Sequence, residues 1–388
     1  MNLYDNLSML EGIKIVDMTS VVFGPYATQI LADMGAEVIK IESGIGDTMR
    51  YSIKPAKTRA MGPAHLSLNR GKKSAYLDLK TEEDCKVMRN LLKEADIFVH
   101  NVRHDPIKRL GFDYEEVKKI KDDIIYVHCV GFGSDGPYGG LPAYDDIIQA
   151  ATGTTSLLSR VDGDPKQRFF PSLIADKVAG LHGAYATMAA IIHKLRTGRG
   201  QFVEVPMFES FAHFMLKEHL GQHSYIPPTG PACYDRQVNP YRQPYPTKDG
   251  YIVIVPYTLQ SWEPLYEALG APEVLENERY ASLKNRVKNQ NELYAGIADK
   301  TPQKTTAEWM KILREKGLIC TPAIDIEAVV DDPHLRESGL VRQAEHPTEG
   351  AFYELAEPGT YSEWSPKDPA PAPLLGEHTD EIKSKYSD

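Results

Sequence analysis

One acidic residue has surroundings that suit covalent chemistry. Asp176 lies in the segment IADKVAG, among apolar and small residues and directly before a long helical pattern. It can cap that helix, because Asp oxygens accept the N–H groups that a first helical turn leaves unpaired. It can also be a nucleophile, because a carboxylate at a helix N-terminus stays ionised and, in a dry site, is poorly solvated and able to attack a carbonyl carbon. The helix after it carries small residues that let a ligand or another backbone approach: Ala179, Gly180, Gly183 and Ala184.

Other patterns that often carry chemistry are weaker. GFGSDG at 131–136 fits G-x-G-x-x-G after a strand, but a dinucleotide site needs a helix to start there, and Pro137 and Pro142 oppose one. We expect a glycine-rich turn instead. His219 and His223 are four residues apart without an HExxH motif, so two exposed histidines are expected rather than a metal site. The four cysteines form no CxxC pair, which favours neither a disulfide framework nor a zinc knuckle.

Composition excludes several classes of protein. The 388 residues carry 44 basic and 54 acidic side chains, a net charge of −10, which opposes sequence-independent binding to nucleic acid. No apolar run approaches the roughly 20 residues that a membrane helix needs. The N-terminus lacks a basic start followed by an apolar core, so we expect no signal peptide. A cytoplasmic protein with neither nucleic acid nor membrane as a partner is predicted.

The first half of the chain alternates between strand and helix patterns. Strands are expected at 13–18, 37–42, 74–79, 96–101 and 123–132, with a helix ending at Gly35 and another capped by Thr81. Residues 43–73 are expected to form a long loop. This alternation predicts a parallel sheet wrapped by helices. Ligands bind at the carboxyl ends of such strands, which draws attention to Thr19, Ser43, Asn101 and the loop after Val130.

The second half changes character after a helix expected at 176–196. A strand at 202–207 and a helix at 208–220 precede a Pro-, Tyr- and Arg-rich stretch, and a smaller unit then begins with the strand GYIVIVPY. Its helices are expected near 260–269, 283–299 and 305–316. We predict an α/β protein with a large Rossmann-like parallel-sheet domain and a smaller α+β domain. The predicted division is 1–200 for the large domain, 201–224 for a linker, 225–318 for the small domain and 319–388 for a segment returning to the large domain.

Several segments together resemble the class III CoA-transferases, a family that also includes acyl-CoA racemases. The resemblance lies in LEGIKIVDMTSVVFGPYATQILADMGAEVIKIE, LDLKTEED, NVRHDPIKRLGFDYEEV, GFGSDGPY, AYDDIIQAATG, IADKVAG, RTGRGQFVEVPMFES and APLLGEHTDEI. These segments run in order from about residue 10 to the end. The resemblance implies a homodimer of interlocked rings, with CoA and acyl-CoA as substrates, a small carboxylic acid as co-substrate and no further cofactor or metal.

The resemblance gives Asp176 the role of nucleophile. Its carboxylate would attack the acyl-CoA thioester and pass through an aspartyl anhydride and an aspartyl-CoA thioester before CoA reaches the acceptor acid. An alternative is an acyl-CoA racemase or isomerase that exchanges a proton at the alpha carbon. The family racemases pair this acid with a histidine in a Gly-His-Asp segment, whereas this chain has Tyr144-Asp145-Asp146, which favours transfer. Asp145 can also simply start the helix DDIIQAA.

The resemblance also implies a set of CoA-binding positions. They are Val22, Phe23, Ser43, Leu77, Lys80, Asn101, Val102, Arg103, Arg109, Tyr144 and Asp145. Lys and Arg suit the three phosphates of CoA. Ser43 stands where family transferases often have Arg, so Arg50, Lys72 or Lys73 could supply a phosphate or adenine contact instead. In the Pro- and Tyr-rich stretch, Arg236 and Arg242 could meet an acceptor carboxylate, and a plain surface role is equally compatible.

Overall fold

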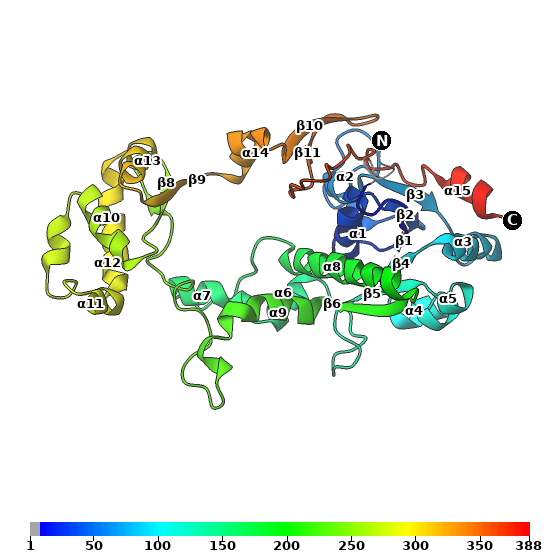
Figure 1. Ribbon diagram of the computed structural model, residues 1–388, viewed down its shortest axis with the longest axis horizontal. Coiled ribbons are helices and arrows are strands. Elements are labelled where there is room, and N and C mark those ends of the chain that lie inside the picture. Colours follow the sequence, from blue (N-terminus) through cyan, green and yellow to red (C-terminus); the bar gives the residue numbers. More distant parts are fainter. Residues whose placement is uncertain (1–7) are drawn as a thin grey trace. The chain divides into compact units, whose positions relative to one another are not determined.

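The structure is a computed structural model that describes residues 8–388 (Figure 1). The chain forms two compact units. Unit 1 comprises the described chain up to Thr154, Phe169–Lys217 and Pro333–Asp388, and unit 2 comprises Thr155–Arg168 and Glu218–Asp332. Across residues 8–388, no helix is both long enough and apolar enough to cross a membrane.

Unit 1 is built on a six-stranded sheet in which every pairing is parallel. The strands are β1 (Lys14–Met18), β2 (Glu37–Glu42), β3 (Lys72–Tyr76), β4 (Ile97–His100), β5 (Ile125–Val130) and β6 (Gln201–Pro206). Their spatial order is β3-β2-β1-β4-β5-β6. This is the doubly wound Rossmann order, so the predicted Rossmann-like α/β fold is confirmed. The order reverses between β1 and β4, where such folds place their ligand at the carboxyl ends of the strands.

Helices cover both faces of this sheet (Figure 1). The helices of unit 1 are α1 (Phe23–Asp33), α2 (Pro63–Asn69), α3 (Glu82–Glu94), α4 (His104–Arg109), α5 (Tyr114–Ile120), α6 (Asp145–Ala151), α8 (Ile174–Thr197), α9 (Met207–His219), α15 (Thr379–Tyr386) and α14 (Pro333–Glu337), the last of which packs on β10 instead of the sheet. Successive strand residues point to opposite faces. Ile15 therefore belongs to the core that includes Phe23 of α1, while Val16 belongs to the core that includes Leu91 of α3. Each face of β1 is buried under one layer of helices.

Local signals in the sequence placed several elements correctly. Thr81 caps α3, its Oγ1 accepting the backbone N–H of Asp84 at 3.3 Å. GFGSDG opens no helix. Its Gly133 and Ser134 N–H groups donate to the carboxylates of Glu209 and Glu204, so the turn is closed by the protein's own acids.

The segment 43–73 is more ordered than the expected loop. It contains a 3-10 turn at Thr48–Arg50 and helix α2, and β3 begins at Lys72 rather than residue 74. Tail contacts explain the difference. The His65 ring bonds the carbonyl of Pro373 at 3.0 Å, and the N–H of Gly71 donates to the carbonyl of Ala370 at 2.7 Å.

The C-terminal tail runs along β3, the edge strand of the sheet. The Gly376 N–H donates to Ser74 Oγ at 2.9 Å, and the His378 N–H donates to the Ser74 carbonyl at 2.8 Å. Exposed strand edges invite pairing with other chains, and the tail covers this one. Before the tail, β10 (Val341–His346) and β11 (Gly350–Leu355) form an antiparallel hairpin.

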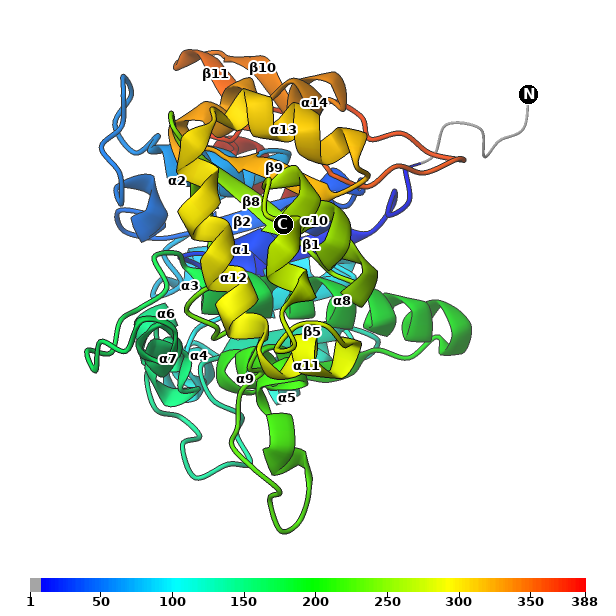
Figure 2. The same ribbon diagram turned by 90° about the vertical axis from the view of Figure 1, so that its left-hand side faces the viewer.

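Unit 2 has an antiparallel sheet of β7 (Tyr245–Pro246), β8 (Tyr251–Val255) and β9 (Ile319–Ala323). Its helices are α7 (Leu157–Asp162), α10 (Trp262–Ala268), α11 (Leu283–Lys288), α12 (Gln290–Lys300) and α13 (Thr306–Glu315). Figure 2 shows α10, α12 and α13 around β8 and β9. Their shared core includes Trp262, Leu293 and Trp309. The helix expected at 283–299 is two helices that meet at Asn289.

Strand pairing moves two of the predicted boundaries. β6 pairs with β5, so residues 201–206 belong to the sheet of unit 1 and not to a linker. β9 pairs with β8, so the first strand of the predicted returning segment belongs to unit 2. The chain re-enters unit 1 at Pro333.

Candidate active site

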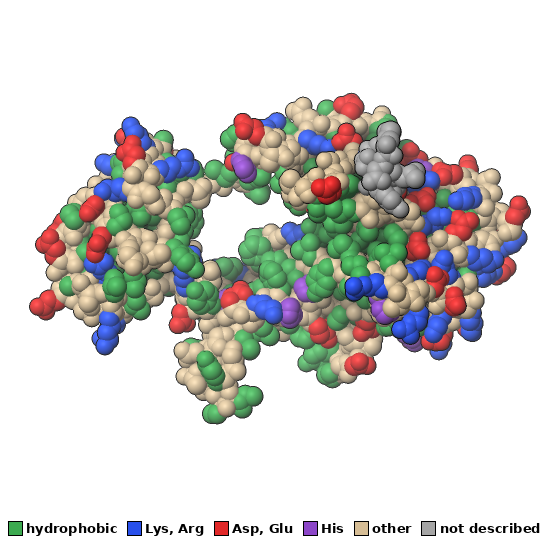
Figure 3. All heavy atoms as spheres, viewed as in Figure 1, with side chains coloured by type: hydrophobic (Ala, Val, Ile, Leu, Met, Phe, Trp, Pro, Cys, Tyr) green, Lys and Arg blue, Asp and Glu red, His purple; other side chains and the backbone are tan. Residues whose placement is uncertain are grey.

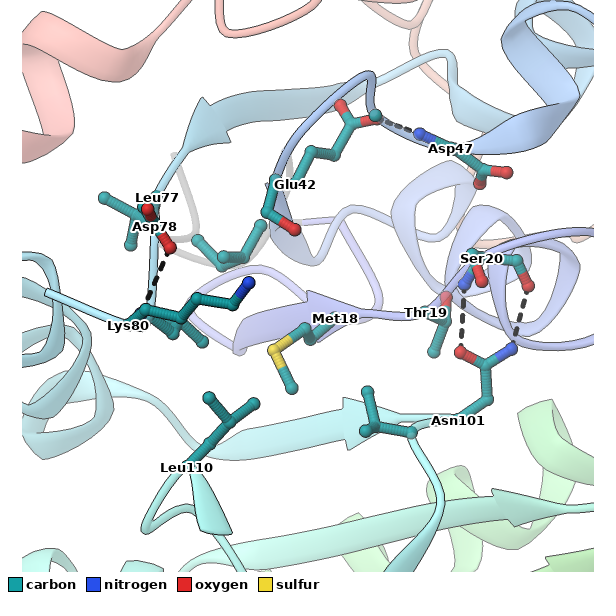
Figure 4. A pocket seen from close by; sticks show the side chains of 15 residues that line it. Met18, Thr19, Ser20, Glu42, Asp47, Leu77, Asp78, Lys80, Asn101 and Leu110 are labelled. Carbon is teal, nitrogen blue, oxygen red and sulfur yellow. Dashed lines mark hydrogen bonds between the residues drawn. The ribbon is translucent and has the colours of Figure 1, made fainter. Parts of the chain in front are cut away.

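A cavity of about 330 Å³ lies where the strand order of unit 1 reverses (Figure 4). Its walls come from the carboxyl ends of β1, β2, β3 and β4 and from the end of α4. The lining residues are Met18, Thr19, Ser20, Ile41, Glu42, Ser43, Gly46, Asp47, Leu77, Asp78, Leu79, Lys80, Asn101, Val102 and Leu110. The position agrees with the general rule for doubly wound sheets.

Five of the positions expected from the sequence to bind CoA line this cavity. They are Ser43, Leu77, Lys80, Asn101 and Val102. The ammonium group of Lys80 extends into the open space (Figure 4). Asn101 joins the ends of β4 and β1, because its Oδ1 accepts the Ser20 N–H at 3.1 Å and its Nδ2 donates to the Ser20 carbonyl at 2.9 Å.

The other expected positions do not line the cavity. Arg103 and Arg109 are exposed at the two ends of α4, the helix that Leu110 follows. Val22 and Phe23 are buried at the start of α1. Tyr144 is 69% exposed, directly before α6.

Three ion pairs are buried beneath the cavity. Lys72 and Asp17 are 3.2 Å apart, Lys40 and Asp47 are 3.1 Å apart, and Arg50 and Glu42 are 2.6 Å apart. Burial by itself would raise the pKa of Asp17, but the nearby Lys72 and Lys40 outweigh it and hold that pKa at about 2. Because buried charges are stable only when paired, this layer fixes the strand ends that form the cavity.

These pairs correct the expectation for the missing arginine at position 43. Arg50 and Lys72 are fully enclosed and bound to acids, so neither faces the cavity. Lys73 lies outside the cavity and pairs with Glu37 and Glu381. Among the three, none contributes to the lining of the cavity.

Asp176 lies in the first turn of α8 and does not cap it. The residue before the helix is Leu173, which makes no side-chain cap hydrogen bond. The Asp176 side chain is buried, with 5% of the residue exposed. Burial is the largest cause that raises its pKa to about 7, and the nearby Asp145 raises it further, while a hydrogen bond from the Phe23 backbone lowers it.

Asp145 takes the capping role that the sequence allowed for Asp176. Its Oδ1 accepts the N–H groups of Ala175 at 2.7 Å and Asp176 at 3.1 Å. Its Oδ2 accepts from Gln149 Nε2 at 2.6 Å. Asp145 is also the first residue of α6, as the alternative interpretation expected. Asp145 therefore accepts the unpaired N–H groups at the start of α8, and the Asp176 carboxyl group is not needed as a cap.

Close packing of α1 on α8 brings Phe23 to Asp176. The helices touch at Gly180, where an added Cβ would lie 3.0 Å from the Phe23 carbonyl oxygen and 2.9 Å from Tyr26 Cδ1. The small residues after Asp176 therefore admit another backbone, one of the two possibilities that the sequence left open. As a result, the turn 19–23 borders the cavity through Thr19 and reaches Asp176 through Phe23.

Other candidate groups lie elsewhere. In unit 2, the Arg236 guanidinium lies 4.7 Å from the centre of the Tyr257 ring, and Arg242 donates to Gln237. Within residues 8–388, no group of three or more His, Cys, Asp or Glu side chains is arranged to hold a metal ion.

Comparison with known proteins identifies the family of this chain. Residues 10–379 match the model of CoA-transferase family III. The human succinyl-CoA:glutarate CoA-transferase is 32% identical over 384 residues, which cover 97% of this chain and 86% of the human protein. The formyl-CoA:oxalate CoA-transferase of Rhodopseudomonas palustris (strain BisA53) is 32% identical over 406 residues, covering 96% and 92%. A crystal structure of a CAIB/BAIF family protein from Brucella suis superposes with a TM-score of 0.86 at 28% identity, covering 98% and 100%.

This chain belongs to CoA-transferase family III and is an enzyme that transfers CoA between an acyl-CoA and an acid. The resemblance noted in the sequence is thereby confirmed.

Proposed function

We propose that Asp176 carries the acyl group and then CoA during transfer. A carboxylate oxygen of Asp176 attacks the carbonyl carbon of the acyl-CoA, the C–S bond breaks, and a mixed anhydride and CoA thiolate form. The thiolate then attacks the Asp176 carbonyl carbon, which releases the donor acid as its carboxylate and leaves an aspartyl-CoA thioester. The acceptor carboxylate repeats both steps in reverse. The observation that carries this proposal is the buried carboxyl group of Asp176 beside the turn that borders the cavity. Asp145 caps α8, so the Asp176 carboxyl group does not have to.

The cavity is the proposed site of CoA. Lys80 extends into it, and the exposed Arg103 and Arg109 flank it on α4, so three cations are available for the CoA phosphates. The turn 19–23 would then guide the pantetheine arm toward Asp176, and Tyr144, which directly precedes Asp145, is proposed to lie near the reacting end. Holding the thiolate beside the anhydride is worth effective molarities of about 10⁵ M or more, which favours transfer over loss to water.

The environment of Asp145 supports transfer rather than racemisation. Both of its oxygens are already engaged, by two backbone N–H groups and by Gln149. A proton-exchange base would have to be free to accept a proton from the substrate. We therefore expect no solvent deuterium to enter a 2-methylacyl-CoA in the absence of an acceptor acid.

Short dicarboxylic acids are the proposed co-substrates. The names of the two curated relatives include succinyl-CoA, glutarate and oxalate, each derived from a dicarboxylic acid. A panel of acyl-CoA donors against mono- and dicarboxylic acids, followed by mass spectrometry of the CoA esters, identifies the pair.

The same panel tests the role of Asp176. Asp176→Asn should bind CoA and lose transfer by at least about 10³-fold, since it replaces the nucleophilic carboxylate with an amide that cannot attack the thioester. Asp146→Asn is the matched control, because Asp146 is an exposed acid at the start of α6 and should retain activity. An Asp176→Asn enzyme with the turnover of the control would refute the proposal.

A second copy of this chain is the proposed protein partner. Along α8 the residues Leu181, Tyr185, Ile192 and Leu195 are at least half exposed. Their spacing places them along one side of the helix. Figure 3 shows hydrophobic side chains gathered over this region of unit 1. Light scattering should give the mass of a dimer, whereas a monomer at micromolar concentration would contradict the proposal. Interlocking of the two chains stays a prediction.

A further inference from the structure

The turn between β1 and α1 contains a residue in a backbone conformation that its side chain disfavours. Val21 has a φ of 72°, in the left-handed region. A β-branched residue is a genuine outlier there, and such residues persist only where the surroundings hold them, often at functional sites. Phe23, two residues further along the same turn, packs against α8 one turn beyond the proposed nucleophile, its carbonyl 3.0 Å from a Cβ added at Gly180, and its backbone lowers the pKa of Asp176.

The carboxylate of Asp47 contacts the turn at Val21 itself, while Asn101 bonds the neighbouring Ser20. Asp47 Oδ1 accepts the Val21 N–H at 3.0 Å and the Met49 N–H at 3.0 Å. Asp47 Oδ2 lies 3.1 Å from Lys40 Nζ. The same Lys40 Nζ donates to the Thr19 carbonyl at 2.7 Å. The Lys40–Asp47 pair therefore hydrogen-bonds the turn at both Thr19 and Val21.

The rest of the turn is tightly closed. The N–H and Oγ1 of Thr19 both donate to Asp17 Oδ1. A Cβ added to Gly24 would lie 2.4 Å from Thr19 Cβ. Thr19 and Gly24 are thus packed against each other, and Val21 lies in the short turn between them.

We propose that Asp47 is a positioning residue for the reaction, which holds Val21 in its left-handed conformation and thereby aims the Phe23 N–H at the carboxyl group of Asp176. This inference rests on the proposed role of Asp176. When the acyl group is attached, the same N–H can donate to the oxygen that becomes negative in the tetrahedral intermediate. A preorganised donor of this kind is among the larger contributions to acyl transfer.

Asp47→Asn is a specific disruption. An amide has one accepting oxygen, so either its NH₂ group faces the Val21 N–H or its NH₂ group faces the Lys40 ammonium, and both arrangements oppose two donors. Asp47 also lines the cavity, so a second role in holding CoA must be separated from the first. A cavity contact would change the acyl-CoA concentration needed for half-saturation, whereas positioning changes the rate at saturation.

The test is a rapid-quench measurement of acyl-group transfer to Asp176 at saturating acyl-CoA, read by mass spectrometry. Asp47→Asn should lower the rate by about 10²-fold. Asp33→Asn is the matched control, because it breaks another enclosed ion pair, that with Arg70, outside the cavity, and its rate should stay within about 2-fold. In the Val21→Gly background, Asp47→Asn should lower the rate by only about 10-fold, since glycine adopts a positive φ without strain and depends less on Asp47.

The outcomes separate this inference from the proposed function. Absence of label on Asp176 in the unmodified enzyme would overturn both. The inference alone would be overturned if Asp47→Asn acylated Asp176 at the rate of the unmodified enzyme. It would also be overturned if Asp47→Asn changed only the acyl-CoA concentration needed for half-saturation. If Asp47→Asn does not fold, the Val21→Gly/Asp47→Asn double variant is compared with Val21→Gly. A rate about 10-fold lower supports the inference, and equal rates contradict it.

Discussion

The carboxylate of Asp145 accepts the backbone N–H of Asp176 at 3.1 Å. One acid therefore caps the helix that presents the other, and its negative charge raises the pKa of the proposed nucleophile. An acid at a helix N-terminus is usually stabilised in its ionised form by the helix dipole. Here burial, and then the charge of the second acid at the same helix end, raise the pKa of Asp176 to about 7.

Replacing Asp145 should move the pH profile of the reaction. The nucleophile acts as an anion, so kcat/KM should rise with pH around the Asp176 pKa of about 7. Asp145→Asn keeps an oxygen for α8 but removes the charge, so the midpoint should move to lower pH. Asp146→Asn, an exposed neighbour, should leave it in place. A midpoint that stays or rises in Asp145→Asn would contradict this account.

The buried Asp176 should also cost stability at high pH. Its pKa in the folded state is about 7 against an ordinary 3.8, so the folded protein binds the proton more tightly. Stability from this group is then greatest at low pH and is lost as the pH rises through about 7. At 1.36 kcal/mol per unit, the full cost is about 4 kcal/mol. Asp176→Asn should therefore increase the free energy of unfolding at pH 8 by up to about 4 kcal/mol and change it little at pH 4, as measured in urea. Equal gains at both pH values would count against burial as the cause.

The contact between α1 and α8 should limit the reaction rate. In Gly180→Ala the new methyl group would press on the Phe23 carbonyl at 3.0 Å and separate the helices. We expect a loss in kcat of about 10- to 10²-fold and of about 1–3 kcal/mol in stability. Gly183→Ala, whose methyl group would lie 3.2 Å from Ala27 Cβ and 3.7 Å from Phe23 Cε2 and would press on no backbone atom of α1, should have the smaller effect. Equal effects of the two substitutions on kcat would show that the Phe23 contact is not special.

Lys80 should act through the charge of CoA. Lys80→Ala removes a cation that extends into the cavity, and we expect CoA affinity to fall by about 10-fold at low salt and by less at high salt. Lys73→Ala is the control, since Lys73 bonds Glu381 outside the cavity. Isothermal titration at two salt concentrations measures both variants. The role fails if they weaken binding equally.

The sequence was sufficient for the sheet because its strands are short buried runs separated by capped helices. Lys80 and Asn101 follow strand ends, and both line the cavity at that edge of the sheet, whereas the role of Asp176 on α8 stays a prediction. The capping of α8 by Asp145 could not be predicted, because it joins groups 31 residues apart whose proximity depends on packing.

The buried ion pairs were missed for a related reason. Lys40 and Glu42 alternate with Ile39 and Ile41 in β2, which alone is typical of a half-exposed strand. Their partners Asp47 and Arg50 come from the segment read as a loop. The predicted end of the small domain at residue 318 was too early, because β9 belongs to unit 2. The residues of this edge strand are mostly exposed, and such a pattern does not reveal which strand it pairs with.

The central claim is that the Asp176 carboxyl group becomes acylated. The direct measurement is to mix the enzyme with acyl-CoA without an acceptor, quench with hydroxylamine and sequence the peptides by mass spectrometry. We predict a hydroxamate on Asp176 that needs acyl-CoA and is absent from Asp176→Asn. Transfer that proceeds with Asp176 unmodified, or a hydroxamate on a different carboxyl group, would contradict the account.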